Sequence, residues 1–178
     1  MIGPIEPLKP DQVDALRSHL ARHRRESGLD GNHFMPFAPS DPNGPKGFDE
    51  QCAELGYHEL GWQRWFVVQI EGEKERIVAH ISLKSAPLRA ALHRCEVGVG
   101  IELPYRGKGL GRALMRHVIT FAERVPSLAW IDLHVFAHNT AAVTLYRDLG
   151  FVEVGCWTDR FRIDGEGLDE LVMALPLG

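Results

Sequence analysis

Three glycines, Gly107, Gly109 and Gly111, stand at alternate positions between an apolar run and a helical pattern. Glycine weakens strands and helices alike, so three of them at such a junction need a reason. A helix N-terminus leaves backbone amides without acceptors and carries a partial positive charge, and glycines let a bulky anion approach those amides. Basic side chains surround them, namely Arg106, Lys108 and Arg112. The segment indicates a cradle for a phosphate or pyrophosphate; the alternative is a tight turn with solvated basic residues.

Two well-known phosphate-binding motifs do not fit this segment. A Walker loop requires G-x-x-x-x-G-K-[ST], and here Lys108 is followed by Gly109. A dinucleotide fingerprint requires G-x-G-x-x-G near the first strand of the fold, whereas these glycines are spaced G-x-G-x-G in mid-chain. The sequence therefore argues against a nucleotide hydrolase and against a dinucleotide-binding domain.

The run CEVGVGI, residues 95–101, predicts a strand that leads into the cradle. Because side chains alternate along a strand, one face would carry bulky apolar groups, those of Cys95, Val97, Val99 and Ile101. The other face would carry Glu96 and two glycines, Gly98 and Gly100. We expect the first face to join the core and the second to be bare enough for a ligand to lie close to the backbone.

The elements that must position this segment follow from the hydrophobic pattern. Strands are predicted over residues 2–8, 65–70, 76–84, 94–103, 129–136, 151–157 and 168–175, and helices over 11–27, 48–60, 110–125 and 140–149. The stretch 31–47, rich in proline and glycine, predicts a long loop. The order β-α-α-β-β-β-α-β-α-β-β predicts a single α/β domain with a mixed sheet and helices on both faces.

Composition excludes several classes of protein. The chain has 178 residues, enough for one domain, and a net charge of −4 argues against nucleic acid as a partner. No apolar run reaches the roughly 20 residues of a membrane helix, and the N-terminus does not resemble a signal peptide. The three cysteines form no CxxC pair, and the histidine pairs His19/His23 and His134/His138 do not complete a zinc site. We expect a cytoplasmic protein that has neither a membrane partner nor a metal.

Two motifs together resemble the GNAT superfamily of N-acyltransferases. RGKGLG, residues 106–111, matches Q/R-x-x-G-x-G/A, the acetyl-coenzyme A signature of that family, and stands after the fourth strand as it does there. NTAAVTLYRDLGF, residues 139–151, resembles the family's second marker. The resemblance covers residues 65–175. It implies a GNAT-like domain over 1–178, with an acetyl-CoA-binding core in 65–178 and a variable acceptor-side half in 1–64.

The resemblance implies that acetyl-CoA is the cosubstrate. The positions that match the pyrophosphate loop are Arg106, Gly107, Lys108, Gly109, Leu110 and Gly111, with Arg112 just beyond. The pantetheine arm would pair with the main chain of Val99 and Ile101, where strands four and five splay apart. An amide near Ile101 would polarise the thioester carbonyl. Asn139 matches an asparagine that often bonds the cofactor, and it is equally a good helix N-cap.

The resemblance also suggests catalytic residues. Tyr146 matches the tyrosine that commonly protonates the departing thiolate, which requires a modest lowering of a phenol pKa near 10 toward a thiol pKa near 8.5; the alternative is a core tyrosine. An amine with a pKa near 10.4 needs a general base. Glu96 is the first candidate, Glu102 the second, and His134 a further one. Each has an alternative structural interpretation, as an ion-paired carboxylate or a hydrogen-bonded histidine.

The expected activity is direct acetyl transfer to a primary amine of a small molecule. The alternatives are a protein N-terminus or lysine as acceptor, or a non-catalytic acyl-CoA-binding or sensing domain. The loop 31–47 and the second helix would wall the acceptor site. Their acidic residues Asp49, Glu50, Glu54 and Glu59 could favour a cationic amine or form a solvated face. The rings of His33, Phe34, Phe37, Trp62 and Trp65 could line a pocket or pack. A homodimer is a further expectation, because dimers are common in the family.

Overall fold

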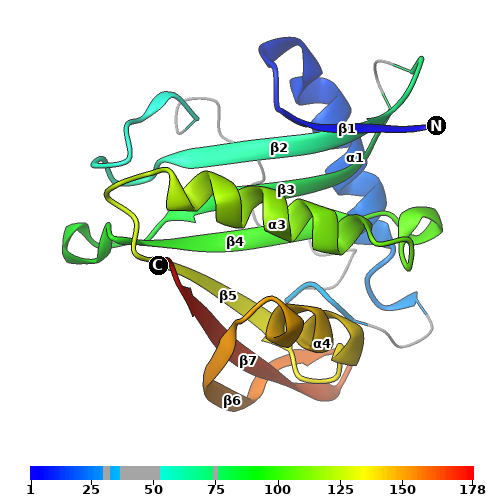
Figure 1. Cartoon of the computed structure of the whole chain (residues 1–178). Coiled ribbons are helices and arrows are strands. Elements are labelled where there is room, and N and C mark those ends of the chain that lie inside the picture. Colours follow the sequence, from blue (N-terminus) through cyan, green and yellow to red (C-terminus); the bar gives the residue numbers. More distant parts are fainter. Residues whose placement is uncertain (30–32, 37–52, 74–75) are drawn as a thin grey trace.

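The computed structural model describes residues 1–29, 33–36, 53–73 and 76–178, which form one mixed α/β fold (Figure 1). Seven strands build a single sheet in the order β1-β2-β3-β4-β5-β7-β6. The strands are β1 (Ile2–Pro7), β2 (Gln63–Ile70), β3 (Ile77–Ser85), β4 (Arg94–Ile101), β5 (Trp130–Phe136), β6 (Val152–Ile163) and β7 (Glu166–Pro176). The helices are α1 (Val13–Arg25), α3 (Leu110–Glu123) and α4 (Thr140–Asp148). The predicted fold class is confirmed.

The parallel strand pair is the feature that shapes the site. All neighbouring strands run antiparallel except β4 and β5, which α3 connects. These two strands pair only where 94–96 face 130–132. Beyond that point β4 continues to Ile101 and β5 continues to Phe136, but the two strands no longer pair with each other. Figure 1 shows them diverging. The structure thus contains the splay of strands four and five that the family resemblance implies.

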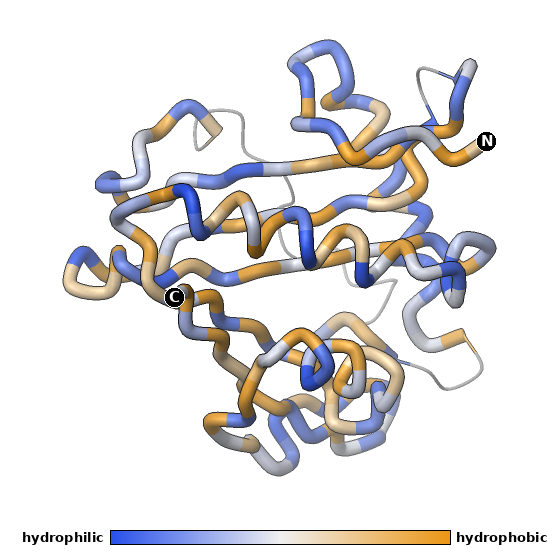
Figure 2. Tube along the Cα trace, in the orientation of Figure 1, coloured by the Kyte–Doolittle hydropathy of each residue, from blue (hydrophilic) through white to orange (hydrophobic). Residues whose placement is uncertain are grey.

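The helices cover opposite faces of the sheet. A Cβ built at Gly100 would meet the His23 ring of α1, whereas the side chain of the next residue, Ile101, lies against Gly111 of α3. Helix α3 buries Leu114 completely in the main core. Its hydrophobic and hydrophilic residues alternate along the tube in Figure 2, as expected of a helix with one face on a sheet. One helix on each face accounts for the alternating pattern of β4.

The helix predicted over 48–60 needs correction, whereas the turn predicted between β6 and β7 is confirmed. The helix predicted over 48–60 lies partly outside the described residues, and in its described part only Ala53 and Glu54 are helical, while residues 55–61 form turns and bends. Asp49, Glu50 and Phe37 also lie outside the described residues. The predicted turn between β6 and β7 is present, because Asp164 and Gly165 both have positive φ, as a type I′ turn requires.

Candidate active site

A row of free backbone amides marks the junction between β4 and α3. None of the described residues accepts a hydrogen bond from the six successive amides of residues 107–112. The next amide, that of Ala113, donates to the carbonyl of Gly109 at 3.1 Å and so begins the helical ladder. Six exposed or half-buried donors at the N-terminus of a 14-residue helix form an anion-binding geometry.

The glycines of the loop have two different roles. Gly107 and Gly109 have φ of +70° and +81°, a left-handed conformation that other residues rarely adopt, and no heavy atom lies within 4 Å of a Cβ built on either. Gly111 is helical, and its Cβ would lie 3.2 Å from Leu145 Cδ2 of α4. Gly107 and Gly109 therefore keep the cradle open, whereas Gly111 permits close packing of α3 on α4.

The basic side chains of the loop do not all face the cradle. Arg106 donates from Nε to the carbonyl of Ile101 at 2.7 Å and from NH2 to Glu26 Oε2 at 2.6 Å, and its guanidinium covers the Phe34 ring. Its side chain therefore joins β4 to α1, contrary to the prediction that it adds charge around the anion. Lys108 donates to the carbonyl of Pro104 at 2.8 Å.

Arg112 occupies the first turn of α3, next to the free amides. Its NH2 group donates to Asp148 of α4 at 2.6 Å, and about two fifths of its side chain is exposed. The distance and exposure fit a solvated ion pair that an arriving anion could compete for. Arg112 and Lys108 are thus the loop cations that remain near solvent beside the amides.

The unpaired edge of β4 presents main-chain groups to the splay. Antiparallel neighbours alternate between hydrogen-bonded and non-bonded pairs, and the amide of Glu102 donates to Val78 of β3. The alternation leaves Val99 and Ile101, opposite Ile81 and Ala79, with main-chain groups that point away from β3. The carbonyl of Ile101 is engaged by Arg106, but its amide and the main chain of Val99 face the gap where β5 has diverged.

Helix α4 carries the second motif. Asn139 is its N-cap, and the side-chain oxygen accepts from the amide of Ala142 at 3.3 Å, so the capping role predicted for it is present. Tyr146 is buried, with 7% of its surface exposed, and packs near Phe151. Burial raises the pKa of the Tyr146 phenol to about 12, the opposite direction to the predicted lowering.

The two predicted carboxylates lie in different surroundings. Glu96 lies on the same sheet face as Gly98, with 37% of its side chain exposed and Lys84 Nζ 3.0 Å away. Glu102 is buried and accepts hydrogen bonds from Arg76, Arg22 and His19 at 2.6–2.9 Å. Burial alone would raise the pKa of Glu102, but these donors outweigh it and lower the pKa to about 2. A carboxylate held so firmly ionised is a poor base, so the geometry disfavours the catalytic role predicted for Glu102.

His134 is supported by a carboxylate that the sequence pattern did not reveal. Its Nδ1 lies 3.3 Å from Glu170 Oε2 of β7, and 33% of its side chain is exposed. The indole of Trp157 lies 5.9 Å away, and Arg160 stacks on that indole. These residues belong to no local sequence motif. They come together because β7 pairs with β5 in the sheet, although the two strands are far apart in the sequence.

The face above Gly100 is not bare, contrary to prediction. A Cβ at Gly100 would lie 2.3 Å from His80 and 2.7 Å from His23, so the two imidazoles occupy the space that a side chain would need. Phe34 stacks on His23, and Trp65 lies 5.3 Å from His80. At Gly98, which is exposed, the nearest atom is the Ser82 hydroxyl. The glycine at position 100 serves the packing of imidazoles, and only Gly98 leaves open space.

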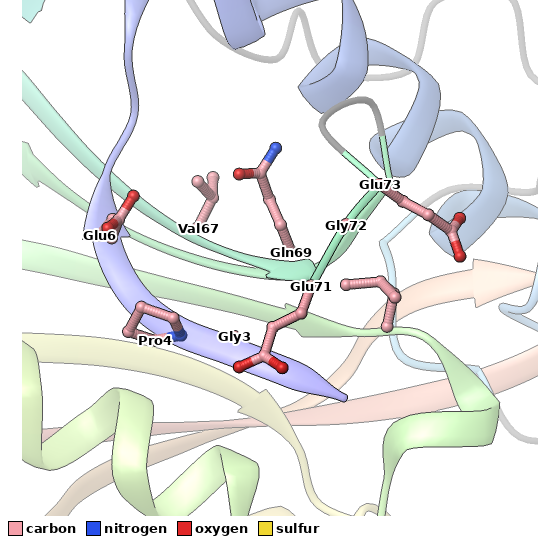
Figure 3. A pocket seen from close by; sticks show the side chains of 9 residues that line it. Gly3, Pro4, Glu6, Val67, Gln69, Glu71, Gly72 and Glu73 are labelled. Carbon is pink, nitrogen blue, oxygen red and sulfur yellow. The ribbon is translucent and has the colours of Figure 1, made fainter.

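Two hollows lie at the margins of the sheet. One, of about 430 Å³, is lined by Ala137, His138 and residues 166–169; it lies just beyond the end of β5 and next to Glu170 of β7. The other, of about 150 Å³, lies between β1 and the turn after β2 and is bordered by Glu6, Glu71 and Glu73 (Figure 3). It lies at the β1 edge of the sheet, whereas the splay lies between β4 and β5 in the middle of the strand order. Among the described residues, no group of three potential metal ligands converges, and no helix is both long and apolar enough to span a bilayer.

The splayed strands and the free amides give a mixed sheet with donors suited to an anion at a helix N-terminus. The chain belongs to the acetyltransferase (GNAT) family, whose sequence model matches residues 32–151. It is 35% identical over 79 residues to a ribosomal protein bS18 alanine N-acetyltransferase of Escherichia coli, covering 44% of this chain and 53% of that protein. It is also 35% identical over 79 residues to a spermidine N(1)-acetyltransferase of Vibrio cholerae, covering 44% of this chain and 46% of that protein.

The chain thus spans about half the length of these curated relatives. The fold is shared more completely. The structure of yncA, an acetyltransferase of Salmonella typhimurium with its cofactor acetyl-CoA, superposes with a TM-score of 0.74 at 18% identity and covers 99% of this chain and 95% of that one. The names of these relatives give different acceptors, a ribosomal protein alanine and spermidine. The similarity to them therefore does not identify the acceptor of this chain.

Proposed function

We propose that this protein transfers an acetyl group from acetyl-CoA directly to a primary amine. The observation that carries the proposal is the row of six amides at residues 107–112 without acceptors, beside the unpaired edge of β4. A diphosphate needs several converging donors, and a thioester arm needs an exposed strand edge; the chain provides both in sequence. The likeness to GNAT proteins supports the same assignment.

The residues fit acetyl-CoA as a bound cosubstrate. The amides of 107–112 would hold its diphosphate, with Lys108 and Arg112 beside them, and Gly107 and Gly109 would leave room for the phosphates. The main chain of Val99 and Ile101 would pair with the pantetheine arm, and Asn139 lies at the start of α4 across the splay. When bound, acetyl-CoA supplies the activated acetyl thioester.

We assign separate roles in the reaction to groups of the protein itself. We assign the Ile101 amide as the donor to the thioester oxygen, because it faces the splay and its carbonyl is fixed by Arg106. Tyr146 remains protonated at neutral pH and would donate a hydrogen bond to the sulfur as negative charge develops there.

His134 is the best-placed base among the predicted candidates. It is partly exposed on the diverging strand and is oriented by Glu170, whereas Glu96 is paired with Lys84 and Glu102 with two arginines. The carboxylate on Nδ1 orients the imidazole and leaves Nε2 as the nitrogen that would accept a proton.

For the acceptor, we propose a small-molecule amine that enters by the hollow beside Glu170. Glu96 and Glu170 are each paired with a cation, Lys84 and Arg160, whereas Glu166 and Asp169 line the hollow and would favour a cationic amine there. An amino group at a protein N-terminus is the second candidate, favoured by the alanine N-acetyltransferase among the relatives.

The experiment is an amine panel with the purified protein and acetyl-CoA, read as thiol release and as acetylated product. The panel contains phosphinothricin, spermidine, lysine and a peptide that begins with alanine. Turnover of any member supports acetyl transfer, and the preferred member identifies the acceptor class. Saturable binding of acetyl-CoA without turnover of any member would favour a sensing domain, and absence of binding would refute the cradle.

A further inference from the structure

Arg160 of β6 presents a guanidinium whose hydrogen-bond donors are free. Its central carbon lies 4.1 Å from the centre of the Trp157 ring, and 47% of the side chain is exposed. Glu170 Oε2 lies 3.6 Å from its Nε, which makes an ion pair but is too long for a hydrogen bond. None of the described residues accepts a hydrogen bond from this guanidinium. An oxyanion from outside the chain could therefore take both arms of a fork that the indole already holds in place.

A β-bulge puts Arg160 in this position. The register of β6 on β7 shifts here, and residues 158–160 stand opposite Asp169 alone. Asp159 in the bulge has φ of +50°, and its amide donates to Asp169 Oδ1 at 2.8 Å. A Cβ at Gly167 would lie 2.6 Å from Asp159 Oδ1, so glycine at this position makes room for the bulge. Bulges often turn a side chain toward an active site, and the contacts with β7 hold this one in a fixed shape.

One carboxylate joins Arg160 to the proposed base. Glu170 Oε2 lies 3.3 Å from His134 Nδ1 and 3.6 Å from Arg160 Nε, so the imidazole and the guanidinium are close neighbours. The Trp157 ring lies beside both, because its centre is 5.9 Å from that of the imidazole. A base for an amine and a receptor for an oxyanion are thus next to each other.

These groups lie on the face of the sheet from which an acceptor can reach the splay. In β5 the side chain of Leu133 is buried in the core with Leu114 of α3, so that of His134 points to the opposite face. Helices α3 and α4 approach each other at Gly111 and Leu145 and cover the first face, where the free amides begin α3. A cosubstrate that enters from the side of α3 leaves the opposite face to the acceptor.

We propose that Arg160 binds the carboxylate of the acceptor, and that the acceptor is a free amino acid whose α-amino group faces His134. The inference rests on the proposed acetyl transfer and names the class of its second substrate. An α-amino acid carries both groups on one carbon atom, which suits a base and a guanidinium that share one Glu170 oxygen. Two parallel hydrogen bonds from the guanidinium to the carboxylate would fix the direction of the amino group.

The charges around Arg160 match a zwitterion. Glu170 lies beside the imidazole, and Glu166 and Asp169 line the neighbouring hollow, so an ammonium group is attracted to this side. Arg160 supplies the positive charge that a carboxylate requires. Spermidine has no anionic group to occupy Arg160, and in a peptide the carboxyl group of the first residue is an uncharged amide. The geometry therefore favours a free amino acid over both of those acceptors.

The test compares matched acceptors in the wild type and in Arg160→Gln. Leucine, phenylalanine, glutamate and phosphinothricin are each assayed with acetyl-CoA as the free acid and as the α-carboxamide, in which that group is uncharged. Arg160→Gln should reduce the ratio of kcat/KM between acid and amide about thirtyfold, the contribution of a charge-assisted pair. Because this ratio is compared between two proteins, the different amine pKa values of acid and amide cancel. The Kd for acetyl-CoA should be unchanged.

Two further variants complete the test. Arg160→Lys keeps the charge but loses the fork, so its ratio should lie between those of the wild type and Arg160→Gln. The control is Arg89→Gln, which replaces an exposed arginine in the turn between β3 and β4 and should keep the wild-type ratio.

The outcomes separate this inference from the proposed function. A ratio for Arg160→Gln within about twofold of the wild type would overturn the role of Arg160 while leaving acetyl transfer intact. Turnover of spermidine or of the peptide that begins with alanine, without turnover of any free amino acid, would overturn it equally. Failure of the wild type to acetylate any amine would instead refute the proposed function, and this inference with it.

Discussion

Replacement of Gly109 by alanine tests whether the open space above the amides of residues 107–112 is needed to bind acetyl-CoA. The effect on binding can be measured separately from the effect on folding stability. Gly109 has φ of +81°, and a Cβ there would touch no protein atom. The variant should lose only about 1–2 kcal/mol of folding stability, the cost of a left-handed alanine. The new methyl group would project where an anion must approach the amides of residues 107–112.

The loss of affinity can be worked from the same donors. A hydrogen bond to a charged group contributes about 1.5–3 kcal/mol, so displacement of a phosphate from two amides removes about 3 kcal/mol. Since about 1.4 kcal/mol corresponds to a factor of ten, the Kd for acetyl-CoA should rise about a hundredfold. Isothermal titration calorimetry measures this change, and urea unfolding measures the stability of the same sample.

The turn after β2 supplies the matched control. Gly72 also has positive φ, +85°, and no atom within 4 Å of its Cβ, but it lies outside the splay and the cradle. Gly72→Ala should therefore show the same loss of stability with the wild-type Kd. If Gly109→Ala folds and binds acetyl-CoA within about threefold of the wild type, the assignment of the amides to the diphosphate is wrong.

Three further predictions follow from single residues. Tyr146→Phe should lower kcat about a hundredfold with little change in Kd for acetyl-CoA, and because the phenol pKa is about 12, the wild-type rate should show no alkaline loss from Tyr146 below that pH. Glu102→Gln should destabilise the fold by about 3 kcal/mol at pH 7 in urea unfolding, since it leaves two arginines unpaired. The Glu102 pKa is lowered to about 2, so its stabilisation is complete above the usual glutamate pKa and is lost as pH falls toward 2; the difference between wild type and variant should shrink there, and a constant difference would contradict the ion-pair account. Iodoacetamide should modify the exposed Cys156 and spare Cys95 in the native protein, because burial raises the Cys95 pKa to about 12; rapid labelling of Cys95, read by mass spectrometry, would contradict the burial.

Local pattern was sufficient for the fold and for the conformation of the glycine loop. The periodicity of each segment predicted the strands and helices, apart from the end of the helix expected over 48–60, where residues 55–61 form turns. The glycines predicted the loop because left-handed φ is a property of single residues, as at Gly107 and Gly109. Asn139 was predicted as an N-cap for the same reason, since a cap contacts only the first turn of its own helix.

The sequence pattern did not predict the partners of individual side chains. Arg106 was expected to face the anion, but it turns to Glu26, 80 residues away, and Glu102 was expected to be a base, but it is held by Arg22 and Arg76. Gly100 was expected to be open, but imidazoles from other elements fill its space. In each case the contacts come from distant segments of the chain that only folding brings near.

By itself, the sequence determined that a strand, three glycines and a helix follow one another, and with them the free amides and the family of the protein, because these features depend on neighbours along the chain. The tertiary structure alone decided which carboxylate is held by arginines, which arginine turns away from the loop and which histidines pack above Gly100. Those outcomes depend on burial and on charges from distant segments, and no spacing in the sequence records them.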